Sequence, residues 1–377
     1  TYSLFFAQMK TQFGISMTRI TSHNTIRAVV GAVTGVYATG LFYRVKNKKL
    51  YFFATITTIS FGYVLIALDP TGIGWYAGSV LVGSLIGSAV ICLSYVLGKW
   101  FPDNKGLVTG IATSFSGVAG VIFNPVAGSL IESIGVIKAL YCFSALNFTV
   151  GMIGSALVFP KAGDHFFEED VQPAQKKKGG FANVSIPHLV PRFIFTVMVL
   201  TGSNIMLQFI FNVSVFAQAV GYSLAQAASV ASFVMVGNIT GKLIFGALAD
   251  RFDPITAVLI VGSCLGGAVL VYIFFANMYP LLCAASVLYG FCYCFGNVGM
   301  ARCAARVYGE KGQKSIVGYH VSITQGVGAV ISLLIGMVYD RFGSFTPVLW
   351  IGFASFCVMM LGAVCLRRLE KQDGLLE

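Results

Sequence analysis

A lysine and an asparagine lie one helical turn apart within an apolar stretch of the chain. Asn238 and Lys242 share one face of a helix, because residues four apart are neighbours on a helix surface. An ammonium group inside a lipid-embedded helix costs roughly 2.5–3.5 kcal/mol on insertion scales, so such a residue commonly has a function. Its charge would neutralise a substrate carboxylate, and the amide would orient the lysine or bind the same substrate. Snorkelling of Lys242 to a nearby membrane surface, or a structural ion pair, is the alternative.

Three further polar residues recur at intervals of four in an earlier apolar stretch. Arg19, His23 and Arg27 therefore form one stripe on a predicted helix. Lipid does not solvate such a stripe, so we expect it to face a cavity or another helix. Arg27 lies about 12 Å deeper than Arg19 at 1.5 Å per residue and is the candidate for a second cationic contact with an attracted anion. The alternatives are positive surface charge that closes against another part of the molecule and, for His23, a structural histidine.

Other polar side chains in apolar stretches suit either substrate contacts or hydrogen bonds between helices. His320 lies close to Gln325 and could relay a proton or bind substrate. Gln208 follows Asn204 by one turn, a spacing that suits a substrate contact or an interhelical hydrogen bond. Both interpretations stay open for each residue.

Arg302 and Arg306 flank one end of an apolar stretch, where basic residues form either a gate or an anchor at the cytoplasmic surface. The sequence contains no metalloprotease motif and no ATP-binding P-loop. Its 9 cysteines lie mostly in apolar runs as packing residues, and the pair Cys292 and Cys294 is a weak metal signal. We therefore predict a protein that is not an enzyme and that holds neither a metal nor a cofactor.

The composition of the chain places these residues in a membrane protein. Of 377 residues, 56% are hydrophobic and 10% are charged, and the mean hydropathy is +0.81, whereas soluble domains are typically about 25% charged. Runs such as Tyr51–Leu68 and Ile255–Ala276 carry no charge and match the roughly 20 residues of a membrane-spanning helix. The two-residue alternation of a transmembrane barrel is absent, so helices must satisfy the backbone in lipid.

Apolar runs between polar breaks predict twelve spans in two groups of six. The polar segment 160–188 between the groups suits a cytoplasmic linker. We predict an all-α fold with an N-terminal six-helix bundle at 1–159, whose first helix is truncated, a C-terminal six-helix bundle at 189–366 and a cytoplasmic tail at 367–377. The predicted spans are 1–9, 17–42, 50–69, 74–98, 107–131, 136–159, 189–217, 222–249, 255–276, 279–301, 315–338 and 346–366.

Basic residues are distributed unevenly among the predicted loops. If both termini are cytoplasmic, most of the 25 basic residues fall in cytoplasmic segments. Only Lys10, Arg19, Lys138 and Arg341 fall in outer loops. This is the positive-inside pattern, so the net charge of +11 indicates orientation in a membrane rather than binding of nucleic acid. We predict a monomeric, multi-pass protein of the cytoplasmic membrane with both termini in the cytoplasm and the lipid bilayer around it.

A related turn ends four of the predicted spans. The turns begin at Gly40, Gly128, Gly246 and Gly336, which are about 90 residues apart within each half. Each repeat thus contains three spans, an odd number, so successive repeats insert in opposite orientations. Inverted three-span repeats nested in two six-span halves are typical of secondary transporters, which bind substrate near the midplane of the membrane.

The third of these turns, Gly246-Ala-Leu-Ala-Asp250-Arg251, resembles the loop 8–9 signature of the major facilitator superfamily. The resemblance implies two six-helix bundles that work by alternating access. It also implies that Gly246, Asp250 and Arg251 act in gating, with the acid paired to basic groups and helix ends. The copy in the first half departs from the signature, because Arg44 stands in place of the acid.

A second motif, Lys99-Trp-Phe-Pro-Asp-Asn-Lys-Gly106-Leu-Val-Thr-Gly110, is similar to the loop 4–5 motif of the oxalate–formate antiporter and monocarboxylate transporter branch. That branch implies a substrate-binding cation in span 8, four residues after an Asn or Asp, which matches Lys242 and Asn238. It also implies substrate-facing aromatic residues, and the matching positions are Tyr2 and Tyr293.

Four matched positions depart from the oxalate antiporters, and two of them, Val90 and Ser116, stand in place of aromatic residues of the substrate cage. Asn297 replaces an aromatic residue of their substrate cage, and Thr324 stands where they carry a second cation. These departures argue against oxalate itself and leave carboxylates as the substrate class. We expect antiport or proton symport of a small mono- or dicarboxylate. Efflux of a lipophilic or drug-like compound, a channel, and a nutrient sensor without transport remain alternatives.

Overall fold

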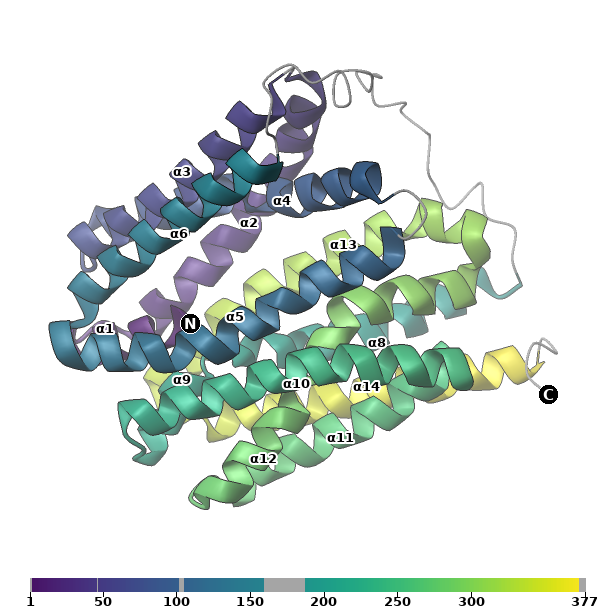
Figure 1. Ribbon diagram of the computed structural model, residues 1–377. Helices are drawn as coiled ribbons and strands as arrows, with labels where there is room; N and C mark the ends of the chain where they lie inside the picture. The colour runs from purple at the N-terminus through teal and green to yellow at the C-terminus, as the bar shows by residue number, and fades with distance from the viewer. Residues whose placement is uncertain (1, 46, 102–104, 159–186, 373–377) are drawn as a thin grey trace. The chain divides into compact units, whose positions relative to one another are not determined.

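The computed structural model describes residues 2–45, 47–101, 105–158 and 187–372, and the regular structure within them is helical (Figure 1). The helices group into two compact units. Unit 1 comprises Thr1–Ala7, Ser114–Ser129 and Lys178–Glu377, and unit 2 comprises Gln8–Thr113 and Leu130–Lys177. The predicted domains follow sequence order, so the units differ from them at the start of the chain and at residues 114–129. The predicted linker at 160–188 lies outside the described residues except for its last two, and residues 373–377 also lie outside them.

Unit 2 is built mainly on four long helices, α2 (Met17–Arg44), α3 (Lys48–Leu68), α4 (Ile73–Trp100) and α6 (Val136–Val158), with parts of α1 (Tyr2–Phe13) and α5 (Lys105–Ile134). A Cβ atom at Gly62 would lie 2.8 Å from the carbonyl oxygen of Gly78, so α3 and α4 cross with their backbones in contact. The Ser144 hydroxyl of α6 donates to the Ser60 carbonyl of α3 over 2.7 Å. Small residues and interhelical hydrogen bonds of this kind stabilise helix contacts in lipid.

Unit 1 contains the helices that follow the predicted linker. A Cβ atom at Gly202 would lie 2.6 Å from the Ser355 carbonyl oxygen, which brings α8 against α14. Gly237 packs directly on the Val287 carbonyl, which brings α10 against α12. The helices are α8 (Leu189–Ile210), α9 (Val213–Val220), α10 (Leu224–Arg251), α11 (Pro254–Phe274), α12 (Tyr279–Gly290), α13 (Met300–Phe342) and α14 (Thr346–Gln372).

Two predicted spans of unit 1 contain breaks, and a third break lies between two predicted spans. Residues 189–217 form α8 and α9 rather than one helix, and the Asn212 side chain between them donates to the Gln208 carbonyl over 3.4 Å. Such a side-chain bond competes with the helical backbone bond. The span 279–301 forms α12, a π-helical turn η2 (Phe295–Gly299) and the start of α13. Within α13, Gly309 has a φ of 67°, which separates the predicted spans 279–301 and 315–338.

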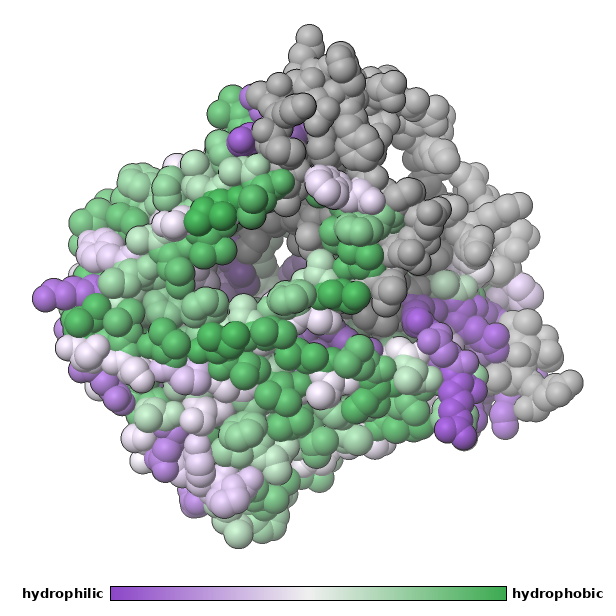
Figure 2. Space-filling model, in the orientation of Figure 1, coloured by the Kyte–Doolittle hydropathy of each residue, from purple (hydrophilic) through white to green (hydrophobic). Residues whose placement is uncertain are grey.

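Eight helices within the described residues are long and apolar enough to cross a membrane, and Ile73–Leu85 and Tyr279–Gly290 are shorter apolar helices. On the face of unit 1 shown in Figure 2, hydrophobic side chains cover most of the helix surfaces and hydrophilic ones gather near the helix ends. Both observations support a multi-pass membrane protein. The count of twelve spans stays a prediction.

Candidate functional site

Lys242 and Asn238 both point into the interior of unit 1. Both residues are buried on α10. They are buried because α10 packs closely against the end of α12. A Cβ atom at Gly241 would lie only 2.8 Å from the Cα of Phe291. Lys242 therefore lies beside the break between α12 and η2, within electrostatic range of the Cys294 thiol. A buried cation thus lies next to irregular backbone, an arrangement that transporters use for binding sites.

The Asn238 amide is only partly satisfied. Its Oδ1 atom is buried and has no hydrogen-bond partner among the described residues. Its Nδ2 atom lies 4.0 Å from the Met235 sulfur, a weak acceptor. An unsatisfied buried acceptor costs about 1–3 kcal/mol. The oxygen is therefore available to a donor, such as the ammonium of Lys242 one turn along the same face or a substrate hydroxyl.

The α12–η2 break carries two predicted aromatic-cage positions. Tyr293 is half-buried just before η2. The backbone of Asn297 lies within η2, and its side chain lies outside the part that the structure describes. π-Helical turns occur frequently at functional sites. Sequence reasoning missed this break, although Gly290, Gly296 and Gly299 around it were a signal.

His320 and Thr324 of α13 lie along its contact with α8. The His320 Nε2 atom lies 2.9 Å from the Tyr308 hydroxyl, and its ring stacks on Phe193 at 4.8 Å. The Thr324 hydroxyl donates to the His320 carbonyl over 2.8 Å. His320 and Thr324 are both buried, and the imidazole is a group that can accept a proton there. Sequence reasoning missed Tyr308.

Asn204 and Gln208 of α8 bond to each other within the helix, and their substrate role stays a prediction. Gln208 Nε2 donates to Asn204 Oδ1 over 3.2 Å. Both amides pack over Gly328, where a Cβ atom would lie 2.7 Å from Asn204 Oδ1. Gly328 follows Thr324 by one turn on α13, so both amides lie on the same contact between α8 and α13. The pair thus links the helices, and Gln208 is half-buried beside it.

Tyr2 belongs to unit 1 although it starts the chain. It is half-buried on α1, and its ring lies 6.5 Å from that of Phe5. The neighbouring Ser3 hydroxyl lies 2.9 Å from the Ser214 hydroxyl of α9. The first turn of α1 therefore belongs to the same unit as α10, the helix that carries Lys242.

The stripe of α2 faces α4 within unit 2. Arg19 donates to the Gly72 carbonyl over 2.5 Å and lies over the Tyr76 ring at 5.0 Å. His23 Nδ1 lies 2.9 Å from the Ser79 hydroxyl, and the imidazole packs edge-on against Trp75. These contacts favour a structural role for both residues. Arg27 is half-buried, and it belongs to a different unit from Lys242.

The predicted gating residues cluster where α10 ends. Asp250 forms an ion pair with Arg302 of α13. Arg251 lies over the Phe252 ring at 5.5 Å, and Gly246 faces open space. The acid of the turn thus contacts a basic group at the end of another helix of unit 1. This arrangement can tie α10 to α13.

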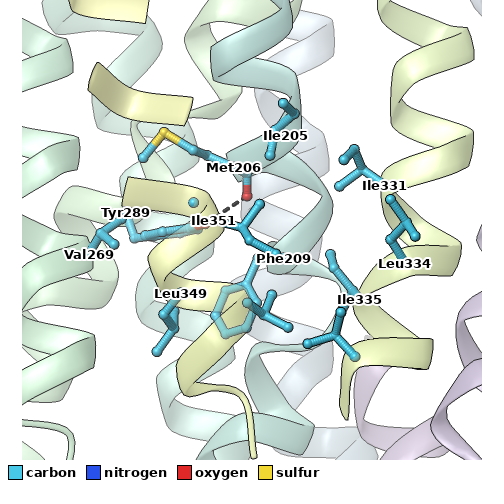
Figure 3. A pocket seen from close by; sticks show the side chains of 13 residues that line it. Ile205, Met206, Phe209, Val269, Tyr289, Ile331, Leu334, Ile335, Leu349 and Ile351 are labelled. Carbon is cyan, nitrogen blue, oxygen red and sulfur yellow. Dashed lines mark hydrogen bonds between the residues drawn. The ribbon is translucent and has the colours of Figure 1, made fainter. Parts of the chain in front are cut away.

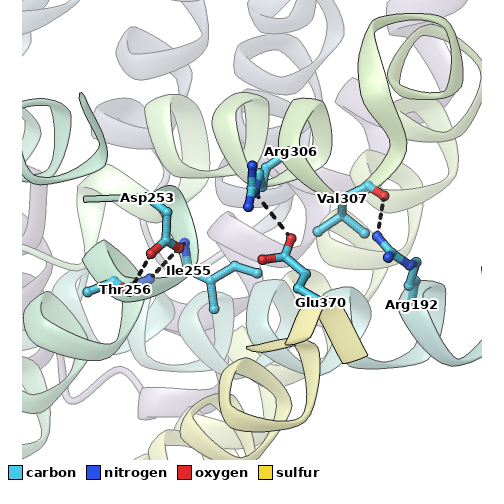
Figure 4. A network of polar contacts seen from close by, with 7 residues as sticks. All are labelled: Arg192, Asp253, Ile255, Thr256, Arg306, Val307 and Glu370. Carbon is cyan, nitrogen blue, oxygen red and sulfur yellow. Dashed lines mark hydrogen bonds and ion pairs between the residues drawn. The ribbon is translucent and has the colours of Figure 1, made fainter. Parts of the chain in front are cut away.

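Arg306 pairs with a carboxylate that sequence reasoning missed (Figure 4). Its Nε atom lies 3.4 Å from Oε1 of Glu370 on α14. The Glu370 side chain is only 1% exposed, whereas that of Arg306 is 33% exposed. Nearby, Arg192 of α8 donates to the Val307 carbonyl over 3.0 Å, and Asp253 caps α11 through the Ile255 amide over 2.8 Å. Four helices of unit 1 therefore meet in one polar network.

Comparison with known proteins gives this geometry a family context. Residues 1–188 and 193–376 match the family described as Major Facilitator Superfamily. The uncharacterized MFS-type transporter YhjX of Escherichia coli K12 is 23% identical over 283 residues, which are 72% of this chain and 67% of that protein. The MFS-type transporter pynF of Aspergillus niger is 22% identical over 373 residues, which are 97% of this chain and 81% of that protein.

Solved structures are similar in fold. A variant of the nucleoside transporter NupG superposes with a TM-score of 0.73 at 11% sequence identity, covering 97% of this chain and 94% of that chain. At this identity the likeness shows the fold alone, and the substrate of that protein says nothing about the substrate here.

Proposed function

Because the chain belongs to the major facilitator superfamily, we propose that this secondary transporter moves a small organic anion across the cell membrane by alternating access. Members of such transporter families are generally not enzymes. The substrate class of the proposal is mono- and dicarboxylates. The proposal includes a monomeric protein with both termini in the cytoplasm.

The observation that carries the proposal is the buried ammonium group of Lys242. Placing a cation inside a membrane-embedded bundle costs several kcal/mol of free energy. A role in substrate binding would explain why the chain carries a lysine there. Asn238, one turn away, has a carbonyl oxygen available to the ammonium and an amide that can donate to a carboxylate. The pair therefore offers a positive charge and a directional donor, which together favour a carboxylate over a neutral solute.

The resemblance to the oxalate–formate and monocarboxylate branch supports the same substrate class. In that resemblance Tyr2, Tyr293 and Asn297 match cage positions, and Thr324 replaces a second cation. We propose that the walls of the site come from Tyr2, Tyr293, Asn297, Thr324 and Gln208. We propose Arg27 as the second residue that contacts the anion through its charge. Asn297 in place of an aromatic residue and Thr324 in place of a cation suit anions other than oxalate.

The second part of the proposal concerns whether transport is coupled to proton movement or to the exchange of anions. His320 has its Nε2 atom bonded to Tyr308, while its buried Nδ1 atom has no hydrogen-bond partner among the described residues. The Tyr308 hydroxyl also lies 3.5 Å from the Arg192 carbonyl oxygen, to which it donates. In the tautomer whose Nε2–H donates to Tyr308, the Nδ1 atom of His320 carries a lone pair and can accept a proton without loss of that bond. If the transporter is a proton symporter, His320 is the residue that we propose to carry the proton. If it is an anion exchanger, His320→Gln leaves exchange intact.

Counterflow in proteoliposomes tests the substrate class. Vesicles loaded with an unlabelled mono- or dicarboxylate are mixed with the same labelled compound, and uptake is followed for wild type, Lys242→Gln and Arg27→Gln. We expect saturable uptake of at least one carboxylate by wild type. Uptake should fall at least about tenfold in Lys242→Gln, since a charge-assisted hydrogen bond contributes roughly 1.5–3 kcal/mol.

Lys138→Gln is the matched control, because Lys138 is an exposed lysine on α6. It should transport like wild type. Carboxylate uptake that is unchanged in both Lys242→Gln and Arg27→Gln rules out the proposed site. Uptake of lipophilic compounds alone, unaffected by Lys242→Gln, would favour the efflux alternative instead.

A further inference from the structure

Helices α8 and α14 are held tightly together along one part of their contact. A Cβ atom at Gly362 would lie 2.9 Å from the Phe195 carbonyl oxygen, and one at Gly202 would lie 2.6 Å from the Ser355 carbonyl oxygen. Beyond Gly202, toward the end of α8, a cavity of about 40 Å³ lies between α8, α13 and α14 (Figure 3). The two helices are therefore in backbone contact on one side of this cavity.

The cavity is apolar. Its lining side chains are aliphatic or aromatic apart from the Met206 thioether, and Tyr289 supplies the only side-chain oxygen or nitrogen atom among the described lining residues. That hydroxyl donates to the Met206 carbonyl over 2.6 Å, so it is already used (Figure 3). A buried water needs two to four polar partners. The lining therefore suits hydrocarbon and neither water nor a carboxylate substrate.

The cavity opens onto the outer surface of unit 1. Leu334 and Ile351 of its lining are 42% and 45% exposed, whereas Met206 and Phe209 are 0% and 3% exposed. Leu334 lies in the candidate span Tyr319–Phe342, and Ile351 lies in Thr346–Gln372. The mouth thus lies within candidate membrane spans, and its apolar, exposed rim suits contact with lipid hydrocarbon.

We propose that this cavity binds the end of an acyl chain of a membrane lipid. Its volume corresponds to about three water-sized spheres, which is enough for a few methylene groups but not for a whole chain. An empty cavity forfeits the dispersion contacts of its lining atoms, and a chain end restores them. The occupied cavity would support the stretch of α8 that carries Gln208. The inference does not depend on the identity of the transported substrate.

Photolabelling tests the proposal on the full-length protein. The probe is phosphatidylcholine with a diazirine at the end of one acyl chain, incorporated in proteoliposomes and activated by light, with adducts located by mass spectrometry. We expect saturable adducts on Met206 and Phe209, which unlabelled phosphatidylcholine reduces. Lipid at the outer surface cannot reach these two buried side chains, so their labelling reports entry into the cavity.

A pair of glycine variants provides the control. Gly352 lines the cavity, and a Cβ atom there would meet no atom within 4 Å, so Gly352→Leu is the variant chosen to add side-chain volume at the cavity. Gly267 of α11 is equally open but does not line the cavity, so Gly267→Leu is the matched variant. We expect Gly352→Leu to reduce labelling of Met206 and Phe209 at least about fivefold, and Gly267→Leu to leave it unchanged.

Two results would overturn the proposal. One is wild-type labelling confined to exposed residues such as Leu334 and Ile351, which would indicate lipid at the surface only. The other is equal labelling of Met206 in wild type and Gly352→Leu. The first result is decisive even if Gly352→Leu fails to fold, because it needs no variant.

Discussion

At the scale of single residues, hydrogen bonding separates the polar groups that hold the fold together from those that remain available. Arg19 and His23 each have a clear partner on α4. Asn238 differs, because its carbonyl oxygen is buried without a hydrogen bond among the described residues. A buried acceptor without a hydrogen bond lowers the stability of the fold. Such an acceptor is expected where a ligand or a moving side chain supplies the missing donor.

Asn238→Ala should therefore weaken transport without weakening the fold. We expect the KM for the carboxylate to rise about tenfold, equivalent to roughly 1.4 kcal/mol. The thermal unfolding midpoint in detergent should stay the same or rise, because an unsatisfied buried group is removed. Asn147→Ala is the contrasting control, since Asn147 donates to the Ser60 hydroxyl over 2.8 Å. It should lower the midpoint and leave KM unchanged, and an unchanged KM in Asn238→Ala would contradict our account.

The pair of Arg306 and Glu370 predicts an asymmetry between its two single variants. Removal of Arg306 leaves a carboxylate that is 1% exposed without this cation, whereas removal of Glu370 leaves a guanidinium that is 33% exposed and can be hydrated. Breaking a buried pair costs about 3–5 kcal/mol when the remaining charge stays buried. We expect Arg306→Gln to lower the thermal midpoint clearly more than Glu370→Gln.

The double variant Arg306→Gln/Glu370→Gln provides the internal control. It should be more stable than Arg306→Gln alone, because no uncompensated charge remains. Equal destabilisation by the two single variants would show that Glu370 is not held mainly by Arg306. The network of Figure 4 would then need another stabilising contact.

At the scale of helices, glycine contacts decide which helices approach closely. Gly237 of α10 lies directly on the Val287 carbonyl of α12. We expect Gly237→Ala to reduce the yield of folded protein strongly, because the added methyl group overlaps rigid backbone rather than a flexible side chain. Size-exclusion chromatography of a fluorescent fusion measures that yield. Gly267→Ala, with open space at its Cβ position, should behave like wild type.

The sequence predicted regular helices well and distorted ones poorly. The predicted spans 50–69 and 255–276 correspond to α3, at Lys48–Leu68, and α11, at Pro254–Phe274. The ends of the apolar runs predict these boundaries, because a helix that crosses the lipid needs about 20 apolar residues. Hydropathy reports exposure to lipid and not backbone distortion, so the π-helical turn after α12 was missed.

The candidate site was only partly predictable for a related reason. Lys242 and Asn238 were found because a charge or amide stands out in an apolar run. Glu370 was missed because α14 continues beyond Arg367 and Arg368, where the predicted span ended. Tyr308 was missed because a tyrosine is not exceptional in a span, and its bond to His320 bridges the break at Gly309. Contacts across such breaks depend on the three-dimensional path of the chain.

At the scale of the whole molecule, the distribution of basic residues predicts the orientation in the membrane. Lys177 lies in the predicted cytoplasmic linker and Lys138 in a predicted outer loop. Cysteines introduced at these positions, with Cys142 and Cys357 replaced by serine because both are exposed, can be labelled with an impermeant maleimide. We expect Lys138→Cys to react in intact cells and Lys177→Cys to react only after permeabilisation. The reverse pattern would invert the predicted topology.

The central claim is that Lys242 recognises a carboxylate, and a selectivity ratio tests it most directly. Uptake of a carboxylate and of its uncharged carboxamide is measured with the same proteoliposomes, for wild type, Lys242→Gln and Lys242→Arg. A ratio within one preparation cancels differences in folding and reconstitution. We predict strong preference for the carboxylate in wild type, partial preference in Lys242→Arg, which keeps the charge, and a ratio at least about tenfold lower in Lys242→Gln. An unchanged ratio in Lys242→Gln would contradict the account.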